Sequence, residues 1–204
     1  DSLPIAWKEH LPFLLNKFSQ TTKYTYLLNL NQDEGALWNS LDSNRRRHIK
    51  TAKKEGFRID KNPDLSTLYD LKNETSDKIK MSKSDFSSLF TPLIDNGCCE
   101  ILSLKDQKGS MMSAILLAHD NGTSYYLLGA NSPKKSSSSS FSLLLWEAIL
   151  QSKHSSSTFE FEGSIVPEIE RFFRSFGGEL TPYHVIHHCP NKFLKVYKYF
   201  KRLF

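Results

Sequence analysis

The segment from Asn44 to Arg58 concentrates the positive charge of the chain and is the first place where the sequence suggests chemistry. It holds seven Arg and Lys residues against the single acid Glu55, a local charge of +6, whereas all 204 residues together carry +5. On a helix with about 100° per residue, Arg45 falls on the apolar arc, while Arg46 and Arg47 point away from it. An inward guanidinium can pair with an internal carboxylate, or it can border a cleft and bind a substrate carboxylate or phosphate through two parallel hydrogen bonds. The residue pattern leaves both interpretations of Arg45 open.

The outward-facing cations of the same segment are a candidate surface for RNA. Arg46, Arg47, Lys53 and Lys54 would supply the charge that a phosphate backbone attracts. The segment has no interleaved aromatic residues, and no motif that reads DNA or RNA occurs in the chain. A solvated basic helix face explains the same pattern.

A serine-rich stretch follows a short apolar run and precedes a long apolar one. Lys134 and Lys135 are followed by five serines, Ser136 to Ser140, and then by Phe141. A loop that enters a helix presents free backbone N–H groups and the positive end of the helix dipole, and both favour anions. The stretch therefore predicts either an anion site or a surface loop with a serine cap.

Two carboxylates and two tyrosines are candidates for proton transfer. In the predicted strand 158–162, Glu160 and Glu162 alternate with phenylalanines and so share one face. Burial would raise the pKa of either carboxyl and suit it to act as a base, whereas pairing with Arg45 or Arg174 would make it structural. Tyr125 and Tyr126 point to opposite faces of their strand, so we expect one to pack and the other to line a cleft.

Histidines and cysteines do not form a convincing metal or disulfide pattern. His187 and His188 lie on opposite sides of a predicted strand, so a shared metal ion is not expected there. The chain has three cysteines, two of them adjacent (Cys98 and Cys99), which argues against a disulfide framework. The cysteine pattern therefore indicates a reducing compartment, and we expect a cytoplasmic protein.

Length and composition predict a globular protein with one sizeable domain. An apolar share of 39% and an aromatic share of 12% exclude a mostly disordered chain. No run of about 18 apolar residues occurs, so no membrane span is predicted. The first residue, Asp1, is compatible with a processed chain or an excised fragment.

Periodicity and turn residues predict an alternation of strands and helices. Helices are predicted at residues 11–18, 33–55, 64–75, 84–95, 141–152, 167–176 and 193–204. Strands are predicted at residues 23–30, 98–105, 110–119, 124–128, 158–162 and 183–188, and residues 57–60 are predicted to be a brief extended piece. The three central strands form an antiparallel meander, and the order as a whole predicts an α/β mixed sheet covered by helices.

Several stretches in this order resemble one known group of enzymes. The stretches are residues 44–56, 126–130, 143–149, 159–164 and 171–179. Together they resemble the GNAT-fold acyltransferases of the Fem-type peptidyltransferase group and their uncharacterised GNAT relatives, over about residues 23–188. The resemblance implies a GNAT fold: a mixed, mostly antiparallel central sheet flanked by helices, with a basic C-terminal helix. Because Fem-type proteins usually carry two such domains, it also implies that residues 23–204 are the second domain and that residues 1–22 trail from an upstream one.

The resemblance further implies N-acyl transfer without a covalent enzyme intermediate. An acyl group on acetyl-CoA or another acyl-CoA, or an aminoacyl group on tRNA, would pass to an amine through a tetrahedral intermediate, with no metal ion. The acceptor would be a small amine or a compound resembling a peptidoglycan precursor. The donor would lie between two separating strands, residues 124–130 and 158–162, with its phosphates at the loop that follows the first. The donor-binding residues implied are Ala130, Asn131, Lys134, Lys135, Ser137, Ser138, Ser139 and Ser140.

The remaining roles combine the resemblance with the residue patterns given above. Glu162 or Glu160 would act as the base, and Arg174, together with Arg45, would bind the substrate carboxylate or the donor phosphate at the reaction centre. Arg45, Tyr125 and Arg171 would bind the substrate.

Two departures from the family pattern keep other functions open. The usual loop pattern Gln/Arg-x-x-Gly-x-Gly/Ala is replaced by serines, and alignment on Phe176-Gly177 puts Phe173 where Fem-type sequences often have a lysine. The alternatives are a catalytically silent GNAT-fold module that supports another domain or a partner, and an RNA-binding surface.

Overall fold

The computed structural model describes residues 11–16, 18–61, 63–75, 79–134, 137–163 and 166–188. The chain divides into two compact units, one of residues 26–179 and the other of Asp1–Thr25 with Leu180–Phe204. The predicted boundary between residues 22 and 23 falls within strand β1 (Ser19–Asn29). The predicted C-terminal helix at 193–204 lies outside the described residues.

The strands form one mixed, mostly antiparallel sheet, as predicted. The strands after β1 are β2 (Arg58–Lys61), β3 (Cys99–Lys105), β4 (Met111–Asp120), β5 (Thr123–Asn131), β6 (Thr158–Glu160) and β7 (Glu179–His187), in the spatial order β2-β3-β4-β5-β6-β1-β7. The meander β3-β4-β5 is antiparallel, as is the pairing of β6 with β1, whereas β5 and β6 run parallel. The α/β fold class predicted from the sequence is therefore confirmed.

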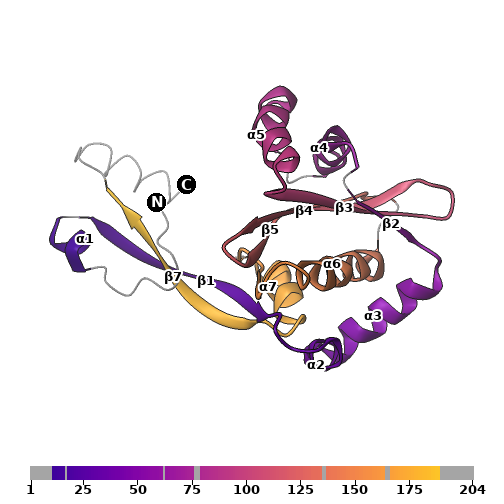
Figure 1. Cartoon of the computed structure of the whole chain (residues 1–204), viewed down its shortest axis with the longest axis horizontal. Helices are drawn as coiled ribbons and strands as arrows, with labels where there is room; N and C mark the ends of the chain where they lie inside the picture. The colour runs from indigo at the N-terminus through magenta and orange to yellow at the C-terminus, as the bar shows by residue number, and fades with distance from the viewer. Residues whose placement is uncertain are drawn as a thin grey trace. The chain divides into compact units, whose positions relative to one another are not determined.

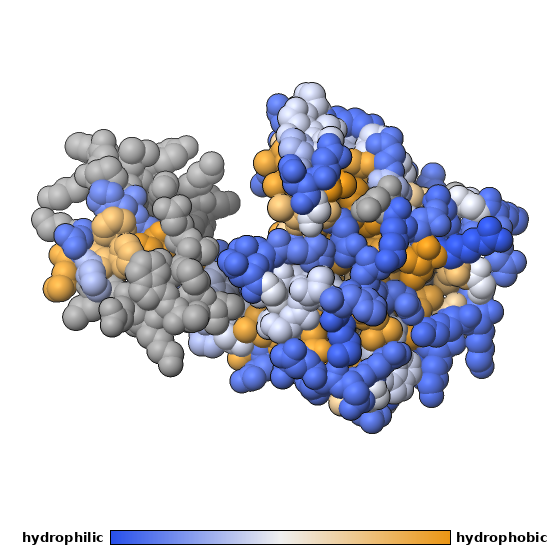
Figure 2. All heavy atoms as spheres, viewed as in Figure 1, coloured by the Kyte–Doolittle hydropathy of each residue, from blue (hydrophilic) through white to orange (hydrophobic). Residues whose placement is uncertain are grey.

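Helices cover both faces of the sheet in the larger unit (Figure 1). The helices of this unit are α2 (Glu34–Ser40), α3 (Ser43–Lys54), α4 (Leu65–Asn73), α5 (Lys83–Asp95), α6 (Ser138–Ser152) and α7 (Pro167–Arg174), whereas α1 (Leu11–Leu15) belongs to the smaller unit. One apolar cluster joins α4 and α5 to one face of the sheet, and the other joins α3, α6 and α7 to the opposite face. Hydrophobic side chains show alongside α5 in Figure 2, while most of the visible surface of this unit is hydrophilic.

The single helix predicted over residues 33–55 is wrong, because two helices occupy this range. α2 begins after Asp33, whose side chain accepts a hydrogen bond from the Ala36 amide at 2.9 Å, and ends at Leu41 in extended conformation. The Asp42 amide then donates to the Ser175 carbonyl at 3.0 Å, a tertiary bond that a continuous helix could not make. The predicted end of the second helix at Gly56 is confirmed, since this residue has φ +68°.

Helix α6 is the centre of the larger core. Trp146 is 1% exposed and meets Trp38 edge to face, with ring centroids 5.3 Å apart. The prediction of a buried apolar helix here is confirmed. Because α6 is fixed along its length, its N-terminus has a well-defined place beside the end of β5.

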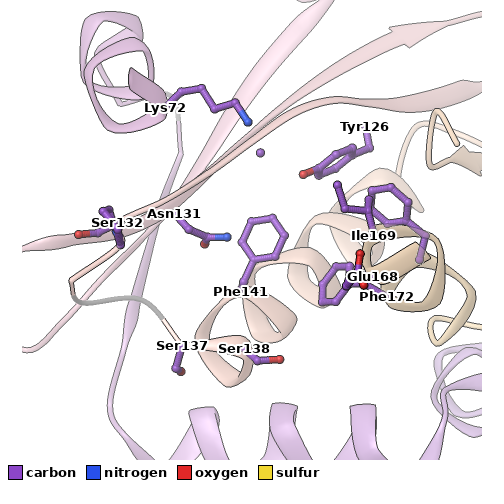
Figure 3. A pocket seen from close by; sticks show the side chains of 13 residues that line it. Lys72, Tyr126, Asn131, Ser132, Ser137, Ser138, Phe141, Glu168, Ile169 and Phe172 are labelled. Atoms are coloured by element: carbon purple, nitrogen blue, oxygen red, sulfur yellow. The ribbon is translucent and has the colours of Figure 1, made fainter. Parts of the chain in front are cut away.

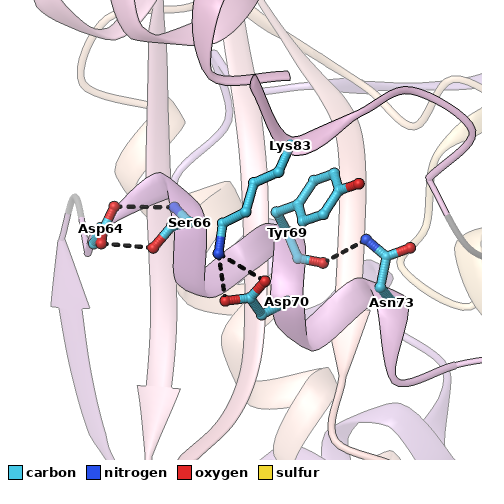
Figure 4. A network of polar contacts seen from close by, with 6 residues as sticks. All are labelled: Asp64, Ser66, Tyr69, Asp70, Asn73 and Lys83. Carbon is cyan, nitrogen blue, oxygen red and sulfur yellow. Dashed lines mark hydrogen bonds and ion pairs between the residues drawn. The ribbon is translucent and has the colours of Figure 1, made fainter. Parts of the chain in front are cut away.

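Polar contacts fix α4 and the start of α5 on the other face of the sheet (Figure 4). Asp64 caps α4 through the Ser66 amide at 3.0 Å. The Lys83 ammonium at the start of α5 binds both carboxylate oxygens of Asp70, at 2.6 and 2.8 Å. These bonds cap the start of α4 and join α4 to the start of α5.

The smaller unit contains α1, the first half of β1 and most of β7. Gln20 Nε2 lies 2.8 Å from His184 Nδ1, and the rings of Phe18 and His188 stack with centroids 4.6 Å apart. His184 of β7 is therefore engaged in pairing, and His188, the residue after β7, in stacking.

A partly buried ion pair closes the end of the sheet where α6 ends. His119 Nε2 lies 3.2 Å from a Glu100 carboxylate oxygen, and Gln151 donates to the other oxygen at 2.5 Å. Burial raises the pKa of Glu100, but the hydrogen bonds and charge of His119 and the bond from Gln151 outweigh it and hold that pKa below its ordinary 4.5.

We expect Glu100→Gln to reduce stability at neutral pH and to lose that effect in acid. A carboxyl with a depressed pKa stabilises the folded state above its unfolded pKa, and this stabilisation disappears as the pH falls through the folded value. The loss at pH 7 should be about 1 kcal/mol, or roughly 2–4 °C in Tm. Thermal unfolding of both proteins from pH 7 to pH 3 checks this, and a constant Tm difference over that range would contradict it.

Candidate active site

Strand β5 has a bulge in its pairing with β4, close to the point where its pairing with β6 ends. Its register with β4 shifts so that Leu116 pairs with Leu128 but Leu117 pairs with Tyr126, which makes Leu127 an extra, bulged residue. Because a bulge reverses the alternation of side chains, Tyr126 and Gly129 lie on the same face of the sheet.

The parallel pairing of β5 with β6 ends at the same level. The last paired residues are Tyr125 and Glu160. Beyond them β5 continues to Asn131, and within the described residues no strand pairs with this edge of it. The pairing of the two strands therefore stops where β6 ends, and β5 has backbone N–H and C=O groups available along one edge beyond that point. That the two strands diverge around a donor stays a prediction of the family resemblance.

A cleft of about 510 Å³ lies beside this free edge (Figure 3). Its walls come from the end of β5, the loop after it, the first turn of α6, helix α7 and one residue of α4. The lining residues are Lys72, Tyr126, Gly129, Asn131, Ser132, Pro133, Ser137, Ser138, Phe141, Glu168, Ile169, Phe172 and Phe173. This is the junction at which the sequence predicted donor binding.

Aromatic rings form much of the cleft wall, and a glycine leaves room among them. Tyr126 meets Phe173 with ring centroids 5.3 Å apart, and Phe141 meets Phe172 at 5.6 Å. A Cβ at Gly129 would overlap the Tyr126 hydroxyl and lie 2.8 Å from Phe141 Cζ. Glycine at 129 is therefore required for the Tyr126 ring to lie across the strand.

The Tyr126 hydroxyl is a proton donor directed into the cleft. It points into the cleft in Figure 3, and among the described residues it has no hydrogen-bond partner. Burial raises the pKa of Tyr126 well above its ordinary value. The phenol is therefore neutral at physiological pH and can donate a hydrogen bond or a proton.

Tyr125 lies on the opposite face of the sheet. Its backbone pairs with Ala118 of β4 on one side and with Glu160 of β6 on the other. Burial, followed by the charge of Glu160, raises the pKa of Tyr125. It does not line the cleft. The expectation that one tyrosine packs and the other lines a cleft holds, with Tyr126 in the cleft and Tyr125, the predicted substrate-binding residue, outside it.

Serines of the serine-rich stretch cap helix α6 and also line the cleft. Ser137 and Ser140 cap α6 reciprocally: Ser137 Oγ accepts from the Ser140 amide at 3.1 Å, and Ser140 Oγ accepts from the Ser137 amide at 2.9 Å. Ser138 lines the cleft, and its Oγ lies 3.3 Å from His48 Nδ1. Burial lowers the pKa of His48, and the charges of Arg45 and Arg47 lower it further.

The other predicted donor-binding residues have different surroundings. Asn131 lines the cleft and accepts a hydrogen bond from Ser113 Oγ at 2.7 Å. Ala130 is 1% exposed and belongs to the core on the α4 side of the sheet. Ser139 is partly buried in the first turn of α6, Lys134 is exposed, and Lys135 lies outside the described residues.

Arg45 is buried behind the cleft. Its guanidinium donates to Ser175 Oγ at 2.9 Å and to Ser142 Oγ at 2.5 Å, and it lies 4.3 Å from the centre of the Phe172 ring. Burial lowers the pKa of Arg45. No carboxylate ion pair of Arg45 is found in the described part of the chain, so the first interpretation, an internal ion pair, is not seen there, and the binding of a substrate carboxylate or phosphate stays a prediction. Arg45 instead joins α3 to α6 and supports the cleft wall at Phe172.

The predicted catalytic carboxylates do not share a strand face. β6 ends at Glu160, and Glu162 has φ +59°, so strand alternation does not extend to it and that part of the prediction is wrong. Glu162 is exposed two residues beyond the last pair with β5, and desolvation raises its pKa. Neither carboxyl is among the cleft-lining residues.

The two predicted arginines of α7 form surface ion pairs on their own helix. Arg174 Nε lies 3.4 Å from Glu170, and Arg171 Nη2 lies 3.6 Å from Glu168, which itself lines the cleft. Both arginine side chains are more than half exposed. Neither belongs to the cleft lining.

Sequence reasoning did not single out the aromatic wall or Lys72. Phe173 entered the sequence analysis only as the position where Fem-type sequences often have a lysine, and Phe141 only as the residue that follows the serines. The triplet Tyr126, Gly129 and Phe141 becomes meaningful only with the bulge at Leu127, for which the local residue pattern gives no clear signal. Lys72 comes from a helix that the sequence separates from β5 by more than fifty residues.

A second, shallower hollow of about 380 Å³ lies on the outer face of α3. Its lining residues are Ser43, Arg46, Arg47, Lys50, Thr51 and Lys54. Arg46 also donates to the Leu41 and Asn39 carbonyls, and Lys53 pairs with Glu147 at 3.3 Å. The outward cations of the basic segment are therefore partly engaged in holding α2 and α6.

Among the described residues, no group of three or more His, Cys, Asp or Glu side chains is arranged to hold a metal ion. No helix in the same ranges combines the length and the hydrophobicity that a membrane crossing needs.

Comparison by sequence gives no match to a family model or to a curated protein. Comparison by structure gives clear matches. FemX aligns with TM-score 0.69 at 15% identity, covering 80% of this chain and 61% of that one. L-PGS from Bacillus licheniformis aligns with TM-score 0.65 at 11% identity, covering 97% and 70%.

A GCN5-related glucosamine N-acetyltransferase region of a fungal β-N-acetylglucosaminidase aligns with TM-score 0.52 at 9% identity, covering 89% of this chain and 22% of that one. The chain thus spans about three fifths of the length of the FemX structure. At these identities the likeness concerns the fold. The chain has the GNAT-type acyltransferase fold that the resemblance predicted, in a form shared with FemX.

Proposed function

We propose that this domain is an N-acyltransferase that moves an acyl group from an activated ester or thioester to an amine. The observation that carries the proposal is the cleft beside the free edge of β5, in which a neutral tyrosine hydroxyl faces the N-terminus of a long helix. The similarity in fold to FemX and to an N-acetyltransferase region supports the same reaction class.

An acyl-CoA fits the features of the cleft. The free edge of β5 offers backbone groups to an extended ligand that carries amides, as the pantetheine arm does. The loop after β5 and the first turn of α6 favour its phosphates, with Ser138 and Asn131 as polar contacts. Gly129 keeps the cleft open at the Tyr126 ring.

An acyl thioester supplies an activated carbonyl carbon, and the residues of this chain would manage the protons. The amine nitrogen forms the new bond to carbon and loses a proton, for which we propose Glu162 as the acceptor through intervening water, because Glu162 does not itself line the cleft. Desolvation makes this carboxylate a stronger base than an ordinary glutamate. As the carbon–sulfur bond breaks, Tyr126 donates its proton to the thiolate and would regain one from solvent.

An aminoacyl-tRNA donor is a second candidate, favoured by the basic hollow on α3. Arg47, Lys50 and Lys54 line it, and their charge suits a phosphate backbone. The amine, the base and the acid would have the same roles with a ribose oxygen as the leaving group. For this donor we propose that the aminoacyl group passes to an amine of a compound that resembles a peptidoglycan precursor.

The proposal is tested by offering the purified protein one donor at a time. Acetyl-CoA, and separately aminoacyl-tRNA, are incubated with a panel of amines, and products are identified by mass spectrometry. We expect an acylated amine with one donor and none without protein. If neither donor is consumed, and neither raises the Tm of the protein at millimolar or saturating concentration, the domain is a silent GNAT-fold module rather than an enzyme.

A further inference from the structure

Helix α7 and the residues just after it carry an apolar stripe that passes from the core into the cleft. Ile169, Phe172, Phe173 and Phe176 recur at the spacing of one helix face. Phe176 is 0% and Phe173 4% exposed, Phe172 is partly buried, and Ile169 is 42% exposed. The stripe therefore emerges from the core where α7 forms one wall of the cleft.

The exposed end of this stripe lies among aromatic side chains. Ile169 lines the same cleft as Tyr126, Phe141 and Phe172, and Figure 3 shows it on the α7 side, near the Tyr126 ring. Phe141 and Phe172 are in ring contact with each other, so α6 and α7 present a joint apolar surface. An apolar wall thus adjoins the hydroxyl that the proposed reaction uses as its acid.

Charged side chains line other parts of the cleft. Among the described residues they are Lys72 and Glu168. Lys72 comes from α4, and Figure 3 shows it on the other side of the cleft from Ile169. The Glu168 side chain is 76% exposed and pairs with Arg171, so its carboxylate lies at the rim. The wall of Ile169 and Phe172 is therefore suited to an apolar group.

An apolar side chain that faces a cavity favours a ligand that covers it. Contact between water and apolar surface is unfavourable, and this cost is relieved when another apolar group takes the place of the water. Single apolar residues scattered over a protein surface are ordinary. Ile169 differs from them because it continues a stripe of the core and lines a cleft.

We propose that the wall of Ile169 and Phe172 holds the acyl chain of the donor, and that this chain is apolar and several carbons longer than acetyl. The inference deepens the proposed acyl transfer and rests on it for the position of the thioester. With the donor phosphates at the first turn of α6 and the thioester at the Tyr126 hydroxyl, the acyl chain meets α7. The reaction is unchanged: the amide bond forms, the carbon–sulfur bond breaks, and CoA leaves as the thiol.

The same wall disfavours an acyl group that ends in a charge. A carboxylate at the end of the chain would lose water on reaching Ile169 and Phe172 without gaining a hydrogen bond from them. An aliphatic or aromatic chain of the same length gains from the same displacement of water. The chemical class of the donor is therefore a thioester with an uncharged, apolar acyl group.

The test is isothermal titration of a series of thioesters into the full 204-residue chain. Acetyl-, butyryl-, hexanoyl- and octanoyl-CoA differ only in chain length, and succinyl-CoA has the length of butyryl-CoA with a carboxylate at its end. Each methylene that leaves water adds about threefold to fourfold in affinity. Partial burial of the chain should then make octanoyl-CoA bind at least about tenfold more tightly than acetyl-CoA, and butyryl-CoA more tightly than succinyl-CoA.

Variants then assign the gain to Ile169. Ile169→Asp should abolish the gain of octanoyl-CoA over acetyl-CoA, and Ile169→Leu should keep most of it. The ratio of the two affinities is compared, because it cancels any general effect of the new charge on CoA. Leu89→Asp is the matched control, since Leu89 is an exposed leucine of α5, 49% exposed, outside the cleft lining. Circular dichroism and Tm establish that each variant is folded.

The outcomes separate this inference from the proposed function. If octanoyl-CoA binds more tightly through Ile169 but no amine is acylated, the chain subsite stands and the enzyme proposal fails. If acyl transfer occurs and acetyl-CoA binds as tightly as octanoyl-CoA, the enzyme proposal stands and the subsite is wrong.

Three further results would overturn the inference. A chain-length gain that survives Ile169→Asp, or that Leu89→Asp removes equally, would place the chain elsewhere. A gain of octylamine over ethylamine in the same titration, with none among the thioesters, would put the acceptor on the apolar wall. If no thioester binds, the acyl-CoA proposal and the subsite both fail.

Discussion

Replacement of Tyr126 with phenylalanine is expected to lower kcat for acyl transfer by about 10²–10⁴-fold while the protein stays folded. The hydroxyl faces the cleft, has no hydrogen-bond partner among the described residues, and has a pKa raised by burial. Its loss removes a proton donor but no internal hydrogen bond, and the ring keeps its contact with Phe173. The affinity for the donor should change little, so the effect should appear in kcat rather than in KM.

Tyr125→Phe is the matched control for this prediction. Tyr125 is the adjacent tyrosine on the same strand, but it lies on the opposite face of the sheet and does not line the cleft. We expect its kcat to stay within a few fold of wild type, a small effect for a residue outside the reaction centre. If Tyr125→Phe lost activity and Tyr126→Phe kept it, the assignment of the two tyrosines would be reversed.

Replacement of Arg45 with alanine is expected to destabilise the domain by about 2–4 kcal/mol, or roughly 5–15 °C in Tm. The variant loses two hydrogen bonds, to Ser142 and Ser175, and the guanidinium over the Phe172 ring, and it leaves a cavity between α3, α6 and α7. Both serines keep their own donor bonds to helix carbonyls, so no buried hydroxyl donor is left unsatisfied.

Two further variants show whether the loss of stability comes from packing or from charge, and whether it is specific to a buried arginine. Arg45→Met restores part of the volume without the charge and should recover part of the stability, because a buried ion is costly to desolvate. Arg47→Ala removes an exposed arginine of the same helix and should change the free energy of unfolding by less than about 0.5 kcal/mol. Thermal and urea unfolding measure all three. An Arg45→Ala protein that kept its Tm but lost substrate affinity would instead support the substrate-binding role predicted from the sequence.

Much of the fold could be predicted because its signals are local. Asn-Gly and Lys-Gly turns between apolar runs predicted the β3-β4-β5 meander, and an apolar run without breakers predicted α6. The break between α2 and α3 could not be predicted in the same way. It depends on the bond from the Asp42 amide to the Ser175 carbonyl, which lies more than 130 residues away in the sequence.

The candidate site was predictable in its location but not in its residues. A strand followed by a serine-rich helix start marked the junction at which the cleft lies, and Asn131, Ser137 and Ser138 line the cleft. Tyr126 and Gly129 share a face only because Leu127 is bulged, and simple alternation would have placed them on opposite faces. Arg45 was correctly placed on the inner arc of its helix, but its partners are serines and phenylalanines, which no charge pattern reveals.

The central claim is that an activated acyl donor lies in the cleft beside β5, and isothermal titration of acetyl-CoA into wild-type and Gly129→Val protein tests it most directly. A side chain at 129 would overlap the Tyr126 hydroxyl and approach Phe141, so it fills the cleft without touching the surface cations of α3. We predict measurable binding to the wild-type protein and a loss of at least about tenfold in affinity in a folded Gly129→Val variant. Equal affinity of the two proteins would place the donor elsewhere and contradict the account.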